Sequence, residues 1–348
     1  MVPRLCILFL LAGAVLAPWR GLGEDAPKPA TASTFQGIIA RQEGALEKAL
    51  GWLAKSQQKD GSWASNGPDG TYRMAMTGLA GLAFLSCGHT PGRGPFGKHV
   101  LKAVEFVLKH QQKDGLITSG DDGQSMYGHG FAMTFLGEAL GMDPNGELAA
   151  KMKTCLTAAV KLTARAQSSW GGWYYSPNSG SDEGSVTITQ VQALRSCANA
   201  GIPVPPKVMT QALSYIHKSQ NVDGGIRYTA QSGGPSSLAL SAAGAELLLM
   251  AGQYDAKETK KAIEYVKGNL SKGSTQGHDF YTNFYASQAM LQVGGKPWED
   301  YYSSLRNRLI TSQGSNGAWS GDVGATYCTS IAVMILALPY NYMPIFQK

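Results

Sequence analysis

The stretch LAKSQQKDGSW at residues 53–63 decides the fold, because four further copies of it follow along the chain. The copies read VLKHQQKDGLI, LTARAQSSWGGW, YIHKSQNVDGGI and RLITSQGSNGAW, and their anchoring glutamines, with the first, are Gln57, Gln111, Gln167, Gln220 and Gln313. In each copy a Gly follows the anchor by four residues and a Trp or Ile follows it by six. Consecutive anchors are 54, 56, 53 and 93 residues apart, and a degenerate copy, KAIEYVKGNL from Lys261, fills the last interval. The sequence therefore predicts six repeat units.

Each unit predicts a pair of helices. Ahead of the anchor, apolar residues recur at helical spacing, as at Ala49, Trp52 and Leu53, which is typical of an amphipathic helix with one buried stripe. An Asp-Gly or Asn-Gly pair then ends the helix, because Gly adopts the left-handed conformation at low cost. After an irregular segment, a more uniformly apolar helix follows in every unit. These second helices begin near Met74, Met126, Val186, Ser237, Phe284 and Thr326.

An amphipathic helix paired with an apolar one, repeated six times, favours two concentric layers, with the apolar helices inside. We therefore expect an all-α fold, an (α/α)6 toroid of six helix-pair repeats over residues 39–348. An open solenoid of six helix pairs is the alternative. The small residues throughout the second helices favour tight inner packing and closure into a ring.

The repeat resembles a known motif. Lys48-Ala49-Leu50-Gly51-Trp52-Leu53, followed by Gln57 and Gly61-Ser62-Trp63, resembles the QW motif of squalene and oxidosqualene cyclases and the repeat of protein prenyltransferase β subunits. The resemblance covers residues 39 to about 340. It implies a terpenoid cyclase-like α/α toroid with its functional groups near the inner-helix ends. We expect the repeated Gln and Trp to be structural, the Gln bonding the backbone at the start of the neighbouring outer helix while the Trp packs beneath it.

The first 38 residues predict export. Arg4 precedes an uncharged run from Leu5 to Leu16 that breaks at Pro18, which is the order of a secretory signal over residues 1–23. An uncleaved anchor is the alternative, although the run is short for a bilayer span. Residues 24–38 are rich in Pro, Ala and Thr and predict a flexible tether. The expected localisation is secreted or periplasmic, without an integral membrane span after signal cleavage.

Composition narrows the class of protein. Charged residues make up 16% of the 348 residues, against roughly 25% in typical soluble domains, and 43% are hydrophobic, which indicates a well-buried globular body. The net charge of +6 contains no block of Lys or Arg, which disfavours nucleic acid as a partner. Beyond the leader, Cys87, Cys155, Cys197 and Cys328 are isolated in apolar stretches and form no CxxC motif. We expect them to be buried and unpaired; disulfides are the alternative for an exported chain.

The segments that precede the inner helices converge on one mouth of such a toroid, where a ligand would bind. Four residues there are candidates for catalysis: His129, Glu183, Asp182 and Tyr127. Four more are candidates for ligand binding: Arg73, Tyr281, Tyr285 and Tyr327. His129 lies between two glycines, where its ring is a general base, a ligand or a buried structural group. Asp182 and Glu183 are acid–base groups, or caps of the helix that follows them.

The motifs that carry the chemistry of the similar enzymes are missing. Protonation-initiated cyclases use DxDD, ionisation-initiated terpene synthases use DDxxD, and protein prenyltransferases hold zinc with an Asp-x-Cys pair and a later His; the sequence contains none of these. We therefore expect a central cavity for an apolar or isoprenoid-like ligand, with no metal or cofactor and with catalysis left open. A zinc set of His129, His278, Asp322 and Cys328 is a further possibility. The alternative functions are a non-enzymatic interaction scaffold and an (α/α)6 polysaccharide lyase or hydrolase.

Overall fold

The computed structural model describes residues 32–65, 67, 70–120, 123–272 and 278–347. The chain divides into two compact units, Met1–Ile39 and Ala40–Lys348. The described residues form twelve α-helices and no strand longer than an isolated bridge. The outer helices are α1 (Ala32–Ser56), α3 (Gly97–Lys109), α5 (Ala149–Ala166), α7 (Pro206–Ser219), α9 (Lys257–Asn269) and α11 (Gly295–Ser312). The inner helices are α2 (Arg73–Ser86), α4 (Ser125–Met142), α6 (Gly184–Asn199), α8 (Leu238–Met250), α10 (Asp279–Val293) and α12 (Ala325–Ala337).

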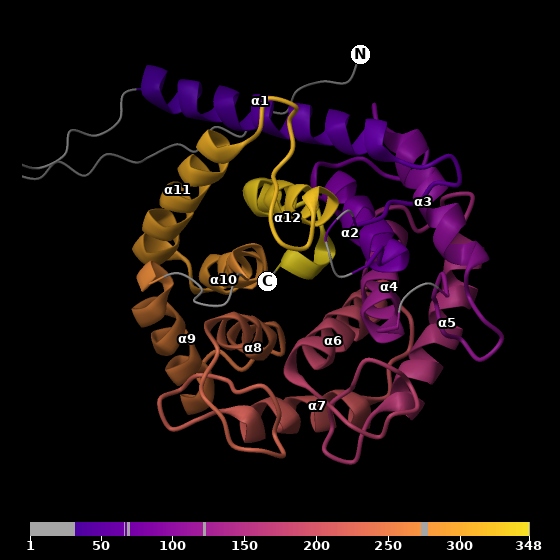
Figure 1. The fold of residues 1–348 in the computed structure, drawn as a ribbon, viewed down its shortest axis with the longest axis vertical. Helices are drawn as coiled ribbons and strands as arrows, with labels where there is room; N and C mark the ends of the chain where they lie inside the picture. The colour runs from indigo at the N-terminus through magenta and orange to yellow at the C-terminus, as the bar shows by residue number, and fades with distance from the viewer. Residues whose placement is uncertain (1–31, 66, 68–69, 121–122, 273–277, 348) are drawn as a thin grey trace, which may run out of the picture. The chain divides into compact units, whose positions relative to one another are not determined.

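The unit Ala40–Lys348 is a ring of two concentric layers, in which α2, α4, α6, α8, α10 and α12 lie inside the other helices (Figure 1). The inner helices are buried almost all round; in α8 every residue from Ala239 to Met250 is buried. The outer helices bury one stripe, which in α3 includes Val100, Val104 and Val107. This confirms the predicted all-α (α/α)6 toroid with its apolar inner layer.

The anchoring glutamines join neighbouring outer helices. Gln167 donates from Nε2 to Gly171 O at 2.8 Å in its own turn and to Val208 O of α7 at 2.9 Å. The other anchors make the equivalent bond to the next outer helix, with the acceptors His99 O, Cys155 O, Glu258 O and Ala45 O. The turn glycine has φ near +100° at Gly171, where a Cβ atom would lie 2.2 Å from Gln211 O. Only Gly fits this close approach between units.

The repeated tryptophans are structural as well. Trp63, Trp173 and Trp319 are buried, and each indole Nε1 donates to a carbonyl oxygen of the preceding outer helix. The prediction that Gln and Trp stabilise the repeat is therefore confirmed. The Trp bond runs within its own unit, while the Gln bond also runs between units.

The ring is closed between its last and first units. Gln313 Nε2 donates to Ala45 O of α1 at 2.8 Å, the same bond that joins the other units. Gln42 Nε2 of α1 donates to Leu336 O of α12 at 2.9 Å, and Thr326 Oγ1 donates to Ala64 O at 3.0 Å. The open solenoid is therefore excluded.

The C-terminal segment packs against the inner helices after two short 3-10 turns, η2 (Leu338–Tyr340) and η3 (Pro344–Phe346). Met343, Ile345 and Phe346 are buried there, and Ile345 N donates to Glu138 Oε2 of α4 at 3.1 Å. Figure 1 shows the C-terminal end lying within the ring of outer helices, beside the inner ones. The chain end therefore belongs to the core of the ring.

The remaining sequence expectations concern the N-terminal segment, the cysteines and membrane-spanning helices. Helix α1 begins at Ala32, so the last residues of the expected tether, 32–38, are helical instead. A helix can form there because the sequence between Pro29 and Pro68 contains no proline that would interrupt it. The leader and the rest of the tether lie outside the described residues. In the described part of the chain Cys87, Cys155, Cys197 and Cys328 are free, as expected. Among the helices that the structure describes, none combines the length and the hydropathy that crossing a bilayer requires.

Candidate functional site

Four of the predicted ligand-binding and catalytic residues form one group, the tyrosine cluster: Tyr127, Tyr281, Tyr285 and Tyr327. Tyr127, Tyr281 and Tyr327 are each the third residue of an inner helix, α4, α10 and α12. Tyr285 follows one turn deeper on α10, with its ring centroid 4.7 Å from that of Tyr281. Burial raises the pKa of Tyr281, and Tyr285, Tyr127, Glu183 and Tyr327 are close enough to raise it further. The cluster therefore converges from three inner helices on one end of the ring.

Glu183 lies beside the cluster and caps α6. Its carboxylate accepts from Ser185 N at 2.9 Å and from Val186 N at 2.5 Å, and Ser185 Oγ also donates to it. Burial raises the pKa of Glu183, and the hydrogen bonds from Val186 and Ser185 oppose that shift. Glu183 therefore caps α6, as one interpretation of the sequence predicted, and its carboxylate also lies near Tyr127 and Tyr281.

Tyr127 is tied to this cap and to a second pair of tyrosines. Its hydroxyl is hydrogen-bonded to Ser185 Oγ, and its ring lies 5.8 Å from that of Tyr175. The Tyr175 hydroxyl in turn is hydrogen-bonded to that of Tyr228. Because burial raises the pKa of Tyr127 and the carboxylate of Glu183 raises it further, the phenol stays protonated at neutral pH.

Sequence reasoning missed Tyr175 and Tyr228, although the repeat register contains them. Each lies two residues after the Trp or Ile that recurs in the repeat, Trp173 and Ile226 respectively. In both units the backbone at this position accepts a bond from the start of the preceding inner helix: Tyr175 O from Met126 N at 3.1 Å, and Tyr228 O from Gly184 N at 2.8 Å. The other units with a Trp or Ile hold Ser65, Ser119 and Gly321 at this position, so the repeat does not single out the two tyrosines.

His129 lies away from the cluster, in a structural joint. Its Nδ1 accepts from Ile117 N at 3.0 Å, and its Nε2 is 3.0 Å from Thr163 Oγ1. The same backbone position is bonded by Thr77, Thr187, Ser241 and Thr329 in other units. Burial lowers the pKa of His129 to about 4, so that the ring is neutral. A Cβ atom at the adjacent Gly130 would lie 2.6 Å from Thr189 Cγ2, so this glycine allows α4 and α6 to pack closely.

The side chains of Asp182 and Arg73 are also held by residues outside the tyrosine cluster. Asp182 Oδ2 accepts from Ser168 Oγ at 2.8 Å and from Gln231 Nε2 at 2.9 Å. Arg73 pairs with Asp60 and lies over the ring of Phe106, 5.3 Å from its centroid. Arg73 is therefore held against the outer helix α3, and the structure does not bring it to the tyrosine cluster.

A second group that sequence reasoning missed is buried among the inner helices. Gln192 Nε2 of α6 lies 3.4 Å from Glu246 Oε2 of α8 and 3.2 Å from Gln288 Oε1 of α10. Burial raises the pKa of Glu246 to about 8, and the hydrogen bond from Gln192 opposes that shift, so the carboxyl is largely neutral at pH 7. Tyr285 is close enough for Glu246 to act on its pKa. A lone acid in the apolar run AAGAELLLM was the available signal.

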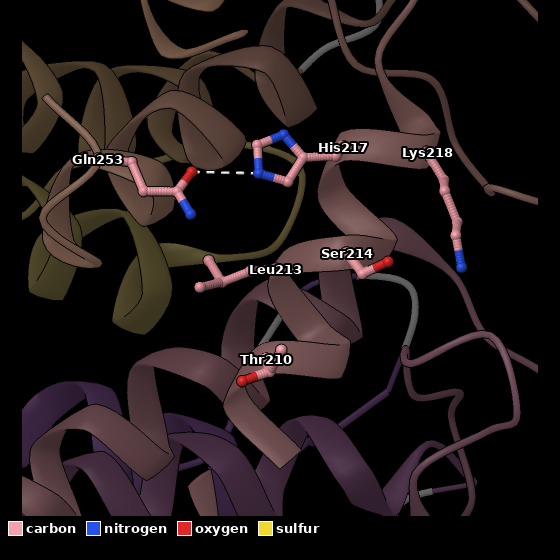
Figure 2. A pocket seen from close by; sticks show the side chains of 6 residues that line it. All are labelled: Thr210, Leu213, Ser214, His217, Lys218 and Gln253. Atoms are coloured by element: carbon pink, nitrogen blue, oxygen red, sulfur yellow. Dashed lines mark hydrogen bonds between the residues drawn. The ribbon is translucent and has the colours of Figure 1, made fainter. Parts of the chain in front are cut away.

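Within the described ranges, no three His, Cys, Asp or Glu side chains gather at a spacing that could hold a metal ion. His129, His278, Asp322 and Cys328 therefore do not form the zinc set considered from the sequence. A groove on the outer layer, lined by Thr210, Leu213, Ser214, His217, Lys218 and Gln253, is shown in Figure 2. His217 Nε2 lies 3.1 Å from Gln253 Oε1 across it. None of the eight predicted site residues lines this groove.

Comparison with known proteins supports the fold. No family model matches the sequence. Drimenyl diphosphate synthase from Streptomyces showdoensis is 26% identical over 201 residues, which are 57% of this chain and 35% of that protein. The chain thus matches about a third of the length of this curated relative.

Solved structures give the same architecture at low identity. A variant of the type II terpene cyclase MstE from Scytonema, in complex with its substrate geranylgeranyl dihydroxybenzoate, matches with a TM-score of 0.63 and 13% identity over 87% of this chain and 98% of that one. Cellobiose 2-epimerase from Bacillus thermoamylovorans matches with a TM-score of 0.64 and 10% identity over 87% and 99%. An α-1,6-mannanase of Salegentibacter matches with a TM-score of 0.62 and 8% identity over 85% and 98%. The chain therefore shares the α/α toroid fold with these structures.

Proposed function

We propose that the ring binds an isoprenoid-like small molecule against the tyrosine cluster. The observation that carries the proposal is the convergence of Tyr127, Tyr281, Tyr285 and Tyr327 from three inner helices at one end of the ring. Aromatic faces offer a large apolar contact area to a hydrocarbon chain, and their electron-rich faces attract positive charge. The similarity to MstE, whose substrate carries a geranylgeranyl chain, supports the same class of ligand.

The residues of the site have separate roles in this proposal. The rings of the cluster contact the ligand, while Glu183 and Ser185 fix the start of α6 and hold the hydroxyl of Tyr127. His129, Arg73 and Asp182 contribute through the joints between units rather than through the ligand. The proposal is for binding; conversion of a bound ligand is an additional outcome that the same experiment detects.

The test measures thermal unfolding of the purified protein with farnesol, geranylgeraniol and squalene, and analyses each mixture by mass spectrometry. A ligand at one hundred times its Kd stabilises the native state by about 2.7 kcal/mol. For a body of this size, with an unfolding entropy of roughly 2.1 cal/mol/K per residue, we expect the midpoint to rise by about 4 °C. Tyr281→Ala should abolish the rise, and Tyr254→Ala, on an exposed tyrosine elsewhere, should keep it. No shift with any isoprenoid would refute the proposal.

The glycan-processing alternative shares the fold with the epimerase and the mannanase. Glycoside hydrolysis requires two carboxyl groups that flank the scissile bond. Here Glu183 is engaged by the α6 cap, and Asp182 by Ser168 and Gln231. Because both carboxyl groups are already engaged within the protein, we favour an isoprenoid ligand over glycan hydrolysis. A glycan panel in the same assay, with detection of new reducing ends, provides the comparison.

Export is the second part of the proposal. It is supported by Arg4 followed by the uncharged run from Leu5 to Leu16. The N-terminal residue and the cellular fraction of the native protein test it. A mature N-terminus beyond residue 16 in an extracytoplasmic fraction is expected, and an intact Met1 in the cytoplasm would contradict it.

A further inference from the structure

The two tyrosines of α10 bury hydroxyl groups that have no hydrogen-bond partner among the described residues. Tyr285 is 1% exposed, and the hydroxyl oxygen of Tyr281 is also shielded from solvent. Thr189 and Tyr281 lie beside the Tyr285 hydroxyl. The Thr189 hydroxyl donates to Ser185 O at 2.9 Å, and no described group lies at hydrogen-bonding distance and angle from either phenol oxygen. A buried hydroxyl without a partner destabilises the native state, so such groups in native proteins need an explanation.

The titratable groups near these hydroxyls are acids, which carry a negative charge or none. The groups that act most strongly on the pKa values of Tyr281 and Tyr285 are the carboxyls of Glu183 and Glu246 and the other tyrosines, with no Lys, Arg or His among them. Arg73, the cation predicted for this site, is held by Asp60 and Phe106 instead. A diphosphate placed here would be repelled by Glu183, and the groups that act most strongly on the two phenols would supply no cation to pair with it.

We infer that the ligand presents an uncharged hydrogen-bond acceptor, such as an alcohol, ketone or quinone oxygen, to the hydroxyls of Tyr281 and Tyr285. This inference rests on the proposed function and names the class of isoprenoid: oxygenated and neutral, rather than a hydrocarbon or a diphosphate. Both phenols donate, because a protonated tyrosine carries one O–H donor. A hydrocarbon would leave both donors unsatisfied, whereas one oxygen with two lone pairs can accept from both.

The experiment compares three probes of equal chain length by calorimetric titration: geranylgeraniol, the hydrocarbon in which hydrogen replaces its hydroxyl, and geranylgeranyl diphosphate. With the unsubstituted protein we expect the alcohol to bind on the order of tenfold more tightly than the hydrocarbon. The diphosphate should bind more weakly than the alcohol. In Tyr281→Phe and Tyr285→Phe the preference for the alcohol should fall towards unity, with hydrocarbon binding unchanged. Tyr254→Phe, which removes an exposed hydroxyl elsewhere, should keep the full preference.

A second measurement separates this role from a structural one. Removal of an unpartnered buried hydroxyl leaves the packing intact and removes a buried group that is not hydrogen-bonded. Without added ligand, Tyr281→Phe and Tyr285→Phe should therefore melt at or above the temperature of the unsubstituted protein. A lower midpoint in both would show that the hydroxyls are satisfied inside the protein and would overturn the inference. Equal binding of alcohol and hydrocarbon, or tighter binding of the diphosphate, would overturn it while leaving isoprenoid binding in place. Binding of none of the probes would refute the proposed function and this inference together.

Discussion

Gln313→Ala tests closure of the ring at a single hydrogen-bonded joint. The side chain donates to Ala45 O and to Gly317 O, both at 2.8 Å. Each bond contributes about 1 kcal/mol, so the variant should lose about 2 kcal/mol of unfolding free energy. At roughly 2.1 cal/mol/K per residue, this corresponds to about 3 °C in the melting midpoint. Urea denaturation and thermal melting of the purified variant measure both values.

Two matched variants make the result specific to closure. Gln167→Ala removes the equivalent pair of bonds between two interior units, at 2.8 and 2.9 Å, and should lose the same amount. Gln112→Ala changes an exposed glutamine beside an anchor and should lose less than about 0.5 kcal/mol. A closed ring predicts equal losses for Gln313→Ala and Gln167→Ala. If Gln313→Ala lost only the roughly 1 kcal/mol of its bond to Gly317 while Gln167→Ala lost about 2 kcal/mol, the joint between the last and first units would not form, and the ring would be open.

Three further predictions follow from buried side chains. Trp63→Ala should lower the unfolding free energy by about 3–5 kcal/mol, because it leaves a cavity in place of a fully buried indole. A loss below about 1 kcal/mol on urea denaturation would mean that the indole of Trp63 is not buried. His129 has a folded pKa near 4, below its unfolded value, so its contribution is present above about pH 6.5 and declines as the pH falls towards 4; the His129→Thr variant should show a flatter stability profile over that window. Glu246 has a raised pKa near 8, so its contribution is complete below about pH 4.5 and is lost as the pH rises through 8; Glu246→Gln should gain stability relative to the unsubstituted protein between pH 5 and pH 9, and an unchanged difference across that range would contradict the assigned burial.

The fold was predictable because the repeat encodes its own contacts. The anchor Gln bonds its own turn and the next outer helix, the turn Gly allows close approach between units, and the Trp or Ile that follows is buried. Five units repeat these positions in phase. Only the partner of the last Gln, Ala45 of α1, needed coordinates, since a linear sequence does not show that its ends meet. The small residues of the inner helices pointed to closure without proving it.

The candidate site was predictable in part. Tyr127, Tyr281, Tyr285 and Tyr327 could be named because they open or line inner helices, and the structure brings them together. His129 attracted attention because glycines flank it, but those glycines serve helix packing, and its ring replaces a Thr or Ser used in other units. A single sequence does not separate these roles, because both require the same residue in the same place.

Other residues of the site were missed for identifiable reasons. Tyr175 and Tyr228 lie in loops without periodicity, and the matching position of other units holds Ser or Gly, so the repeat did not mark them. Glu246 was hidden in an apolar helix, where its neighbours Gln192 and Gln288 come from other units. Contacts of this kind depend on which faces of the inner helices meet, and the helical period alone does not determine that.

An experimental structure of the protein with bound geranylgeraniol tests the central claim most directly. We predict that the ligand contacts the rings of Tyr127, Tyr281, Tyr285 and Tyr327, with its oxygen within about 3.2 Å of the Tyr281 and Tyr285 hydroxyls. A ligand located instead in the outer groove at His217 and Gln253, or an inner layer with no ligand at saturating concentration, would contradict it.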